Sequence, residues 1–258
     1  MKKALSLRRK LKSTRVKQQL GNKQTMDSCV LLLFIFSMLL LACNPKIGEG
    51  LRKNDLKRDV ELTTTKGIIV LRLSDSTPLH RNNYIKLVKQ HFYDSILFHR
   101  VIRNFMIQAG DPTSKTATKQ QRLGEGDLGY TVPAEFRQTL FHKKGVLAAA
   151  RMGDDVNPTK ASSASQFYIV QGKIFSDAGL DSVETFRLKG RKIPAAQREV
   201  YKTIGGAPHL DQNYTVFGEV VKGLSIIDSI ANTPTSGRTG GDRPLEDIRI
   251  IKARLIKR

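Results

Sequence analysis

The sequence has no tryptophan and only two cysteines, Cys29 and Cys43, which both lie near the N-terminus. The rest of the chain contains no thiol, which excludes an internal disulfide and a cysteine nucleophile there. Such a chain neither requires nor excludes an oxidising compartment. The Gly-x-Ser-x-Gly motif that presents the nucleophile of many serine hydrolases is also missing, so the residues give no indication of covalent catalysis.

Metal-binding patterns are missing as well. None of the histidines stands at metal-ligand spacing from another histidine, a cysteine or a carboxylate on a shared helical face, so we expect no metal ion and no cofactor. The five histidines are His80, His91, His99, His142 and His209. A metalloenzyme therefore remains only a remote alternative.

Positive charge is abundant, with 44 lysine and arginine residues against 23 acidic ones and a formal net charge of +21. Nine of the basic residues and only one acidic residue precede residue 43. Such a basic run can bind nucleic acid, but no aromatic side chain that could stack on a base is interleaved with these charges. Their position before an apolar segment is typical of a signal sequence. We therefore expect no nucleic-acid partner.

The apolar segment runs from Val30 to Ala42 and is interrupted only by Ser37. It is shorter than the roughly 20 residues that a helix needs to span a bilayer, and it suits the hydrophobic part of a signal peptide. The segment ends in Leu40-Leu41-Ala42-Cys43, which resembles the lipobox of bacterial lipoproteins. This resemblance implies that residues 1–42 are removed and that Cys43 carries a lipid anchor in the bacterial cell envelope, facing the periplasm. Plain secretory cleavage and an uncleaved anchor remain alternatives.

The remainder of the chain divides into a tether and one domain. Residues 43–57 are polar and contain two glycines, which predicts a tether leading to a domain at 58–258. Period-two alternation and β-branched residues predict strands in that domain, and Pro133 predicts that one of them lies at a sheet edge. The predicted strands cover residues 60–64, 68–73, 130–136, 165–170, 214–221 and 248–256, with two more inside 98–111.

Helices are fewer than strands. Thr77 and Pro78 provide a cap and a first-turn proline for a helix that ends near Gln90. Short helices are also predicted at 180–188, 194–204 and 224–230, and the first two of these fall in an expected helical insertion at about 173–208. Strands predominate and no βαβ repeat appears, so we expect a mainly β fold in which an antiparallel sheet closes into a barrel.

The stretch from Phe98 to Asp111 gathers several groups suited to recognition. Its two short strands, joined by Arg103-Asn104, place a permanent cation, two large apolar groups and an amide where they can line one groove. Taken alone, a stretch of this composition is more often a hairpin with core residues and a solvated arginine. The four side chains are Arg100, Phe105, Met106 and Gln108.

Four separated motifs resemble the cyclophilin-type peptidyl-prolyl cis–trans isomerases, in the order of that family. They are Phe98-His99-Arg100-Val101-Ile102, Phe105-Met106-Ile107-Gln108 with Gly110-Asp111, Ser165-Gln166-Phe167-Tyr168-Ile169, and Leu210-Asp211 before Val216-Phe217-Gly218. The similarity covers about residues 58 to 258 and is nearest to bacterial, envelope-associated members. It implies a closed eight-stranded antiparallel barrel with two capping helices.

The resemblance also implies roles for individual residues. Arg100, Phe105 and Gln108 correspond to catalytic residues of the family. The substrate-binding set is Met106, Ala150, Arg151, Gln166, Tyr168, His209, Leu210 and Tyr214, in which Ala150 and Arg151 would meet the substrate through main-chain groups. Three positions depart from the common pattern: Arg151 stands where many members have asparagine, His209 where eukaryotic members have tryptophan, and Tyr214 where they have histidine. These departures bear on cyclosporin affinity more than on catalysis.

The implied activity is non-covalent isomerisation of X–Pro bonds in unfolded or folding polypeptides, by a monomer that needs no cofactor. Isomerisation breaks no bond, so a charged hydrogen-bond donor and an apolar pocket are sufficient for catalysis. The alternative is a binding module or holdase chaperone that uses the same groove to recognise proline-containing segments without catalysis.

Overall fold

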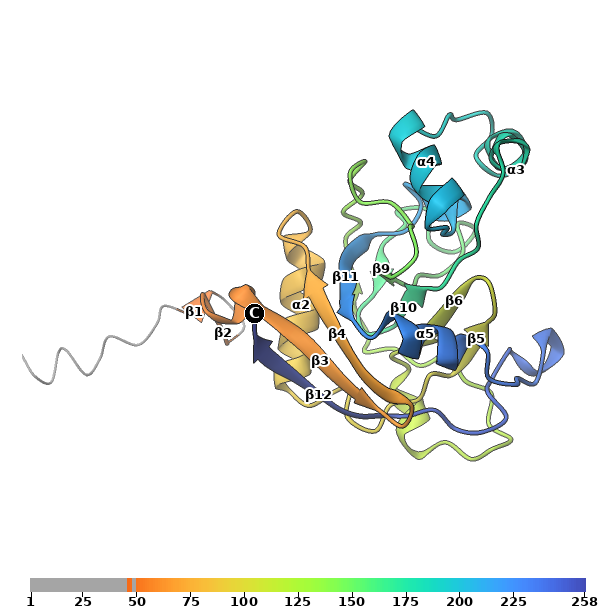
Figure 1. Ribbon diagram of the computed structural model, residues 1–258. Coiled ribbons are helices and arrows are strands. Elements are labelled where there is room, and N and C mark those ends of the chain that lie inside the picture. Colours follow the sequence, from red (N-terminus) through yellow and green to blue (C-terminus); the bar gives the residue numbers. More distant parts are fainter. Residues whose placement is uncertain (1–45, 48–49) are drawn as a thin grey trace, which may run out of the picture. The chain divides into compact units, whose positions relative to one another are not determined.

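The computed structural model describes residues 46–47 and 50–258 (Figure 1). The predicted signal peptide and the predicted lipidation site at Cys43 lie outside the described residues. Within the described part of the chain, no helix is both long and apolar enough to cross a membrane.

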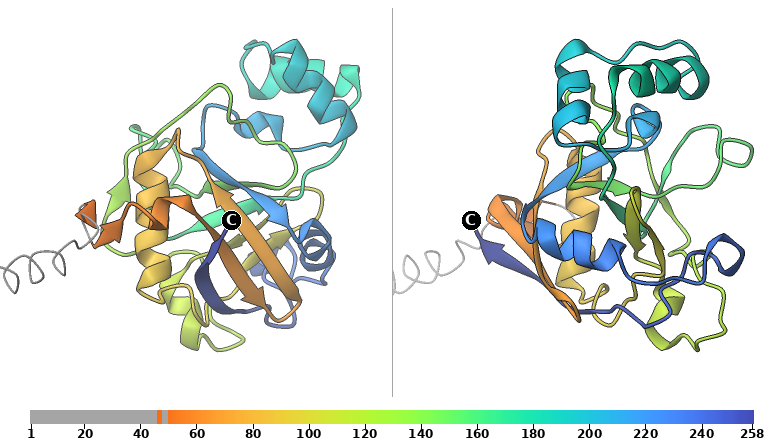
Figure 2. Two further views of the ribbon diagram at one scale, coloured as in Figure 1. Left: turned by 60° about the vertical axis from the view of Figure 1, so that its left-hand side comes forward. Right: turned by 45° about the vertical axis from the view of Figure 1, so that its right-hand side comes forward.

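An eight-stranded antiparallel sheet forms the body of the domain, as expected from the sequence. Its strand order is β12-β3-β4-β11-β8-β10-β6-β5. The strands are β3 (Arg58–Thr64), β4 (Gly67–Leu73), β5 (Arg100–Ile102), β6 (Met106–Ala109), β8 (Val146–Ala149), β10 (Phe167–Val170), β11 (Val216–Lys222) and β12 (Ile250–Lys257). Figure 2 shows that this sheet is strongly curled. The fold is therefore mainly β, with long-range antiparallel pairing.

The expected closure into a complete barrel is seen only in part. Strands β5 and β12 are the two ends of the sheet order, and no ladder joins them among the described residues. The segment before β5 does meet the start of β12: the Phe98 N–H donates to the Ile248 carbonyl at 2.8 Å, and the Ile250 N–H donates to the Ile96 carbonyl at 2.8 Å. The three-residue β5 begins beyond this contact and does not pair with β12, so the sheet forms a curled half-barrel.

The first described residues belong to the folded unit. Strand β1 (Lys46–Ile47) pairs with β2 (Leu51–Arg52), and a 3-10 turn follows at Asp55–Lys57. Leu51 is buried in the main core, and the Lys89 ammonium donates to the Asp55 carboxylate at 2.6 Å. Two apolar side chains, Leu51 and Leu56, and this ion pair therefore attach the predicted tether at 50–57 to the domain.

The predicted edge strand at 130–136 is reduced to β7 (Thr131–Val132), which pairs with β9 (Ser162–Ser163) in a separate two-stranded sheet. Pro133 follows immediately and has no N–H to continue a ladder. Beyond it, Glu135 turns inward and accepts hydrogen bonds from the main chain of Leu79 and His80. The prediction of a strand here holds only for its first residues.

Helices α2 (Pro78–Lys89) and α5 (Leu224–Ala231) share one apolar core with the strands. Helix α2 begins at the predicted Thr77-Pro78 cap and buries Tyr84, Ile85 and Val88. Helix α5 contributes Ile227 and Ile230 to the same core. The two helices and the curled sheet are therefore held by one continuous set of apolar contacts.

The segment predicted as a helical insertion contains α3 (Asp177–Ser182), a π-helical turn (Val183–Arg187) and α4 (Ala195–Thr203). Helices α3 and α4 lie side by side at one end of the domain, away from β3 and β12 (Figures 1 and 2). They pack around a small core of their own, formed by Leu180, Leu188, Ile193 and Tyr201.

A buried carboxylate fixes this insertion. Glu184 accepts hydrogen bonds from the Ile193 N–H at 3.0 Å, Lys192 Nζ at 2.7 Å and Arg198 Nη1 at 2.8 Å. Burial alone would raise the pKa of Glu184, but these donors outweigh it and lower the pKa to about 2. A lowered carboxyl pKa adds stability above the unfolded-state pKa of about 4.3, and that stability is lost as the pH falls toward the folded-state value.

We therefore expect Glu184→Gln to lower the melting temperature at pH 6 but to have little effect at pH 2. Thermal unfolding of the wild type and the variant is compared at each pH, so that the titration of all other groups cancels in the difference between their melting temperatures. An equal difference in melting temperature at pH 6 and pH 2 would show that the carboxylate charge does not stabilise the insertion.

Candidate active site

A small cavity of about 150 Å³ opens on the sheet where β5, β6 and β10 lie side by side. Sites for drug-sized ligands usually measure about 300–1,000 Å³, so a cavity of this size suits a single ring or side chain. Its lining consists of Arg100, Phe105, Met106, Gln108, Ala150, Arg151, Tyr168, Leu210 and Tyr214, all of which the sequence singles out.

Strand register explains why these residues meet. Arg100 is directly opposite Gln108 across β5 and β6, and Gln108 is directly opposite Tyr168 across β6 and β10. Directly paired residues project their side chains from the same face, and Met106 shares that face because it lies two residues before Gln108. Three adjacent strands thus form a polar wall with Arg100 and Gln108 and an apolar wall with Met106 and Tyr168.

Arg100 is held at the rim with part of its guanidinium available. Its Nη1 donates to Gln108 Oε1 at 3.3 Å, its Nε lies 3.8 Å from Asp242 Oδ2, and its side chain remains 42% exposed. No described residue bonds to Nη2. Because a guanidinium keeps its charge and presents its donors in a fixed plane, Arg100 can donate to a group placed over the cavity.

A chain of amides orients this arginine. Gln108 Nε2 donates to Gln166 Oε1 at 3.0 Å, and Gln166 Nε2 donates to the carbonyls of Gly124 at 3.0 Å and Gly126 at 2.8 Å. Each amide oxygen therefore accepts and each nitrogen donates, which fixes both side chains in one orientation. Asp242, on the opposite side of Arg100, is a contact that the sequence reasoning missed, since nothing local marks this loop residue.

The apolar wall belongs to a second, smaller core. Phe105, Met106, Tyr168 and Leu210 are all part of this cluster. His209 lies against Phe105, with ring centroids 5.4 Å apart, but is not part of the cavity lining. Burial and the nearby Arg187 lower the pKa of His209 to about 4, so this ring is neutral at physiological pH. His209 therefore supports Phe105 from outside the cavity.

The Arg151 side chain is committed within the protein. It is 5% exposed and pairs with Asp154 at 2.6 Å. Its guanidinium lies 4.5 Å from the centroid of the Tyr214 ring, and its Nε donates to the Asn213 carbonyl at 2.7 Å. The cation thus stiffens the wall that contains Tyr214 and adds no free charge to the pocket.

The main chain at Ala150 is also engaged. Its N–H donates to the Gln166 carbonyl at 3.0 Å, and its carbonyl accepts from the Ser163 N–H at 2.8 Å. The Arg151 N–H and carbonyl make no main-chain hydrogen bond among the described residues. Of the two residues expected to meet a substrate through the backbone, Arg151 is therefore the freer one.

A second hollow of about 280 Å³ continues the first along the surface. The two share Gln108, Ala150 and Arg151, and Gln166 lines the second. Its outer wall is formed by the loops at 124–131 and 152–163. An extended peptide could therefore place one residue in the cavity and continue along this groove.

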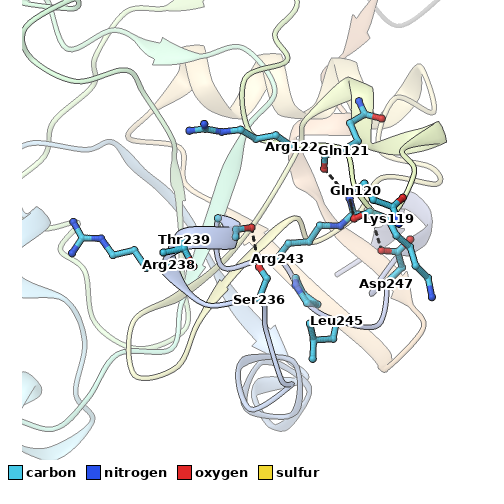
Figure 3. A pocket seen from close by; sticks show the side chains of 13 residues that line it. Lys119, Gln120, Gln121, Arg122, Ser236, Arg238, Thr239, Arg243, Leu245 and Asp247 are labelled. Atoms are coloured by element: carbon cyan, nitrogen blue, oxygen red, sulfur yellow. Dashed lines mark hydrogen bonds and ion pairs between the residues drawn. The ribbon is translucent and has the colours of Figure 1, made fainter.

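A larger hollow of about 570 Å³ lies elsewhere, between the loops at 119–122 and 236–247 (Figure 3). Arg243 ties these loops together by donating to the Thr118 carbonyl at 2.8 Å and to Asp247 at 2.9 Å. The lining of this hollow is mostly polar and cationic, with no aromatic side chain, so it offers no apolar wall to grip a ring.

Among the residues that the structure describes, no group of three or more histidine, cysteine or acidic side chains could hold a metal ion.

Comparisons with known proteins agree with this geometry. Residues 59–255 match the model of the cyclophilin type peptidyl-prolyl cis-trans isomerase/CLD family. A Staphylococcus haemolyticus protein named as a peptidyl-prolyl cis-trans isomerase is 32% identical over 205 residues, which cover 79% of this chain and 93% of the relative. A protein of the same name from Staphylococcus aureus strain USA300 is 33% identical over 209 residues, covering 81% and 95% of the two chains.

The fold is similar to solved structures of the same class. A cyclophilin type peptidyl-prolyl cis-trans isomerase from Cryptosporidium parvum superposes with a TM-score of 0.57 at 21% identity, covering 78% of this chain and 98% of that one. The same protein in the presence of the dipeptide Ala-Pro gives a TM-score of 0.56 at 20% identity, with 78% and 99% coverage. At such identities the likeness concerns the fold, while the family match and the bacterial relatives identify the lineage. The chain belongs to the cyclophilin-type peptidyl-prolyl cis–trans isomerase family.

Proposed function

We propose that the 150 Å³ cavity receives the proline ring of an unfolded or folding polypeptide and that Arg100 accelerates rotation about the preceding peptide bond. The single observation that carries these roles is the position of the partly free Arg100 guanidinium at the rim of a cavity that has an apolar wall and the size of one ring. Phe105, Met106 and Leu210 would grip the ring. Arg100 would then lie beside the atoms whose electronic structure changes.

The chemistry requires no bond to break. An X–Pro bond isomerises over tens to hundreds of seconds, because rotation interrupts amide resonance and meets a barrier of roughly 18–20 kcal/mol. In the twisted imide the nitrogen regains its lone pair and becomes a better hydrogen-bond acceptor. A donor fixed in place stabilises this state more than the planar ground state, and each 1.36 kcal/mol of such preference accelerates the reaction about tenfold.

Gln108 and Gln166 have a supporting role in this proposal. Their hydrogen-bonded amides hold Arg100 in one orientation and border the groove that leads away from the cavity. A donor whose position is set before the substrate arrives needs no reorganisation during the reaction. Gln108 keeps one Nε2 hydrogen that can donate to the main chain of an extended peptide, whereas both Gln166 Nε2 hydrogens are used within the protein.

A protease-coupled assay with proline tetrapeptides tests this function. The purified protein is expected to accelerate cis-to-trans conversion in proportion to its concentration. Peptide binding without acceleration, and binding that survives Arg100→Ala, would identify a proline-recognising binding module or holdase instead of an enzyme.

We also propose that the protein acts in the bacterial cell envelope, anchored through a lipid on Cys43. The support is the basic leader, the apolar segment at 30–42 and the Leu-Leu-Ala-Cys sequence that closes it. Cells that produce the protein and are fed an alkyne fatty acid should incorporate label in the wild type and in Cys29→Ser, but not in Cys43→Ser. Equal labelling of both variants would contradict the anchor at Cys43.

A further inference from the structure

Four buried side chains form a continuous hydrogen-bonded chain behind the cavity. The Tyr201 hydroxyl donates to Asp211 Oδ2 at 2.7 Å, and His142 Nδ1 lies 2.9 Å from Asp211 Oδ1. On its other side, His142 Nε2 lies 2.9 Å from the Tyr168 hydroxyl. All four residues are buried, with exposed fractions of 0–4%.

The donors and acceptors in this chain are mutually consistent. A carboxylate only accepts, so one Asp211 oxygen accepts a hydrogen bond from the Tyr201 hydroxyl and the other accepts one from His142 Nδ1–H. His142 Nε2 is then the acceptor for the Tyr168 hydroxyl. The His142 main-chain N–H also donates to Asp211 Oδ1, at 2.8 Å. Every polar atom has a partner, which favours one fixed arrangement over several loose ones.

The two ends of the chain belong to different parts of the molecule. Tyr201 lies on α4 of the helical insertion, where its ring packs edge-on against Phe141 at 5.5 Å and Phe175 at 6.4 Å between centroids. Tyr168 lies on β10 and forms a wall of the cavity. Asp211, in the middle, directly follows Leu210, another wall residue. The insertion is therefore connected to the cavity by hydrogen bonds as well as by chain continuity.

We propose that the helical insertion sets the shape of the proline pocket through Tyr201, Asp211, His142 and Tyr168. This inference rests on the proposed function, since it assigns Tyr201, Asp211 and His142 as positioning residues for the same pocket. A phenylalanine at position 168 would fill the same wall but would lack the hydroxyl that fixes the ring to His142. The tyrosine therefore gives the insertion control over a wall that packing alone would leave adjustable.

A double-mutant cycle with Tyr201→Phe and Tyr168→Phe tests the proposal. Each variant removes one hydroxyl and keeps its ring, so the fold should survive. Loss of one hydrogen bond corresponds to about a twofold to tenfold change in kcat/KM, and we expect it mainly in KM because the pocket wall binds ground and transition states alike. Both variants release the same wall residue, so the double variant should lose no more than the more affected single one.

Tyr84→Phe is the matched control. Tyr84 is a core tyrosine of α2, as fully buried as the others, and its hydroxyl has no hydrogen-bond partner among the described residues. Its loss should leave KM unchanged. If Tyr201→Phe alters KM no more than this control, or if the effects of Tyr201→Phe and Tyr168→Phe multiply independently, the proposed coupling is overturned.

The methyl signal of Met106 provides a readout that does not depend on activity. Met106 lines the cavity and shares its cluster with Tyr168. If the insertion shapes the pocket, the methyl resonance should move in Tyr201→Phe and stay in place in Tyr84→Phe, even in a protein that proves inactive. An unmoved resonance would refute the coupling, whereas an inactive wild type with a moved resonance would refute the proposed function alone.

Discussion

Replacing Arg100 by alanine is expected to lower kcat/KM for a proline peptide by about a hundredfold to a thousandfold, the range seen when one preorganised donor to a transition state is removed. The guanidinium is partly exposed at the cavity rim and fills no core space. Its loss should therefore change the unfolding free energy by no more than about 0.5 kcal/mol. Kinetic assays and chemical denaturation of the same preparation separate the two effects.

Two further variants sharpen this prediction. Arg100→Lys keeps the charge but loses the planar set of donors, and we expect it to recover little of the activity. Arg103→Ala removes an exposed arginine from the turn between β5 and β6 and should behave as the wild type. Nearly full activity in Arg100→Ala would show that the cavity alone, without a charged donor, performs the reaction.

Gly110→Ala is expected to cause the largest loss of stability, about 3–5 kcal/mol, because it creates overlap with rigid backbone. Gly110 follows β6 with a φ of +103°, and an added Cβ would lie 2.1 Å from the Ser165 carbonyl oxygen and 2.6 Å from the Gln166 Cα. Neither backbone atom can move without separating β6 from β10. Chemical denaturation should reveal the loss, and any folded protein should have a displaced Gln166 and reduced activity.

Gly129→Ala separates backbone strain from overlap. Gly129 also has a positive φ, +75°, but an added Cβ there meets nothing within 4 Å. Its substitution should cost only about 1–2 kcal/mol, the ordinary penalty of a left-handed conformation. Equal losses in Gly110→Ala and Gly129→Ala would mean that close packing of β6 against β10 contributes nothing beyond backbone conformation.

Much of the candidate site could be predicted because its residues come from short motifs with strand periodicity. Arg100 and Gln108 stand on neighbouring strands of one hairpin, so their meeting follows from local pairing. Gln166 and Tyr168 join them only through pairing of β10 with β6. The sequence predicted strands at both places, and the resemblance to a family supplied their proximity.

Other features depend on contacts between distant segments and left no local signal. Asp242 meets Arg100 because the Val101 N–H bonds to the Asp242 carbonyl at 2.9 Å and fixes that loop beside β5. In the sequence His142 was one of five scattered histidines, because its partners Asp211 and Tyr168 lie far along the chain. The packing of Leu51 on the domain likewise depends on its contacts with the core.

The structure adds detail to two of the predicted substrate-binding residues. Arg151 was expected to meet the substrate through its main chain, and its side chain pairs with Asp154 and stacks on Tyr214 within the wall. His209, which was predicted to bind substrate, packs against Phe105, lies outside the cavity lining and is neutral at physiological pH. In both cases a polar side chain adjoining an apolar cavity is engaged by the protein itself, which leaves Arg100 as the cation at the rim.

The most direct test of the central claim is NMR exchange spectroscopy on an Ala-Pro-containing peptide mixed with a small amount of the purified protein. Uncatalysed exchange between the cis and trans signals takes tens to hundreds of seconds and gives no exchange cross-peaks. If Arg100 and the cavity stabilise the twisted bond by about 3 kcal/mol or more, exchange accelerates at least about a hundredfold. We predict cross-peaks with the wild type and none with Arg100→Ala. Absent cross-peaks with a folded, peptide-binding wild type, or equal cross-peaks with Arg100→Ala, would contradict the account.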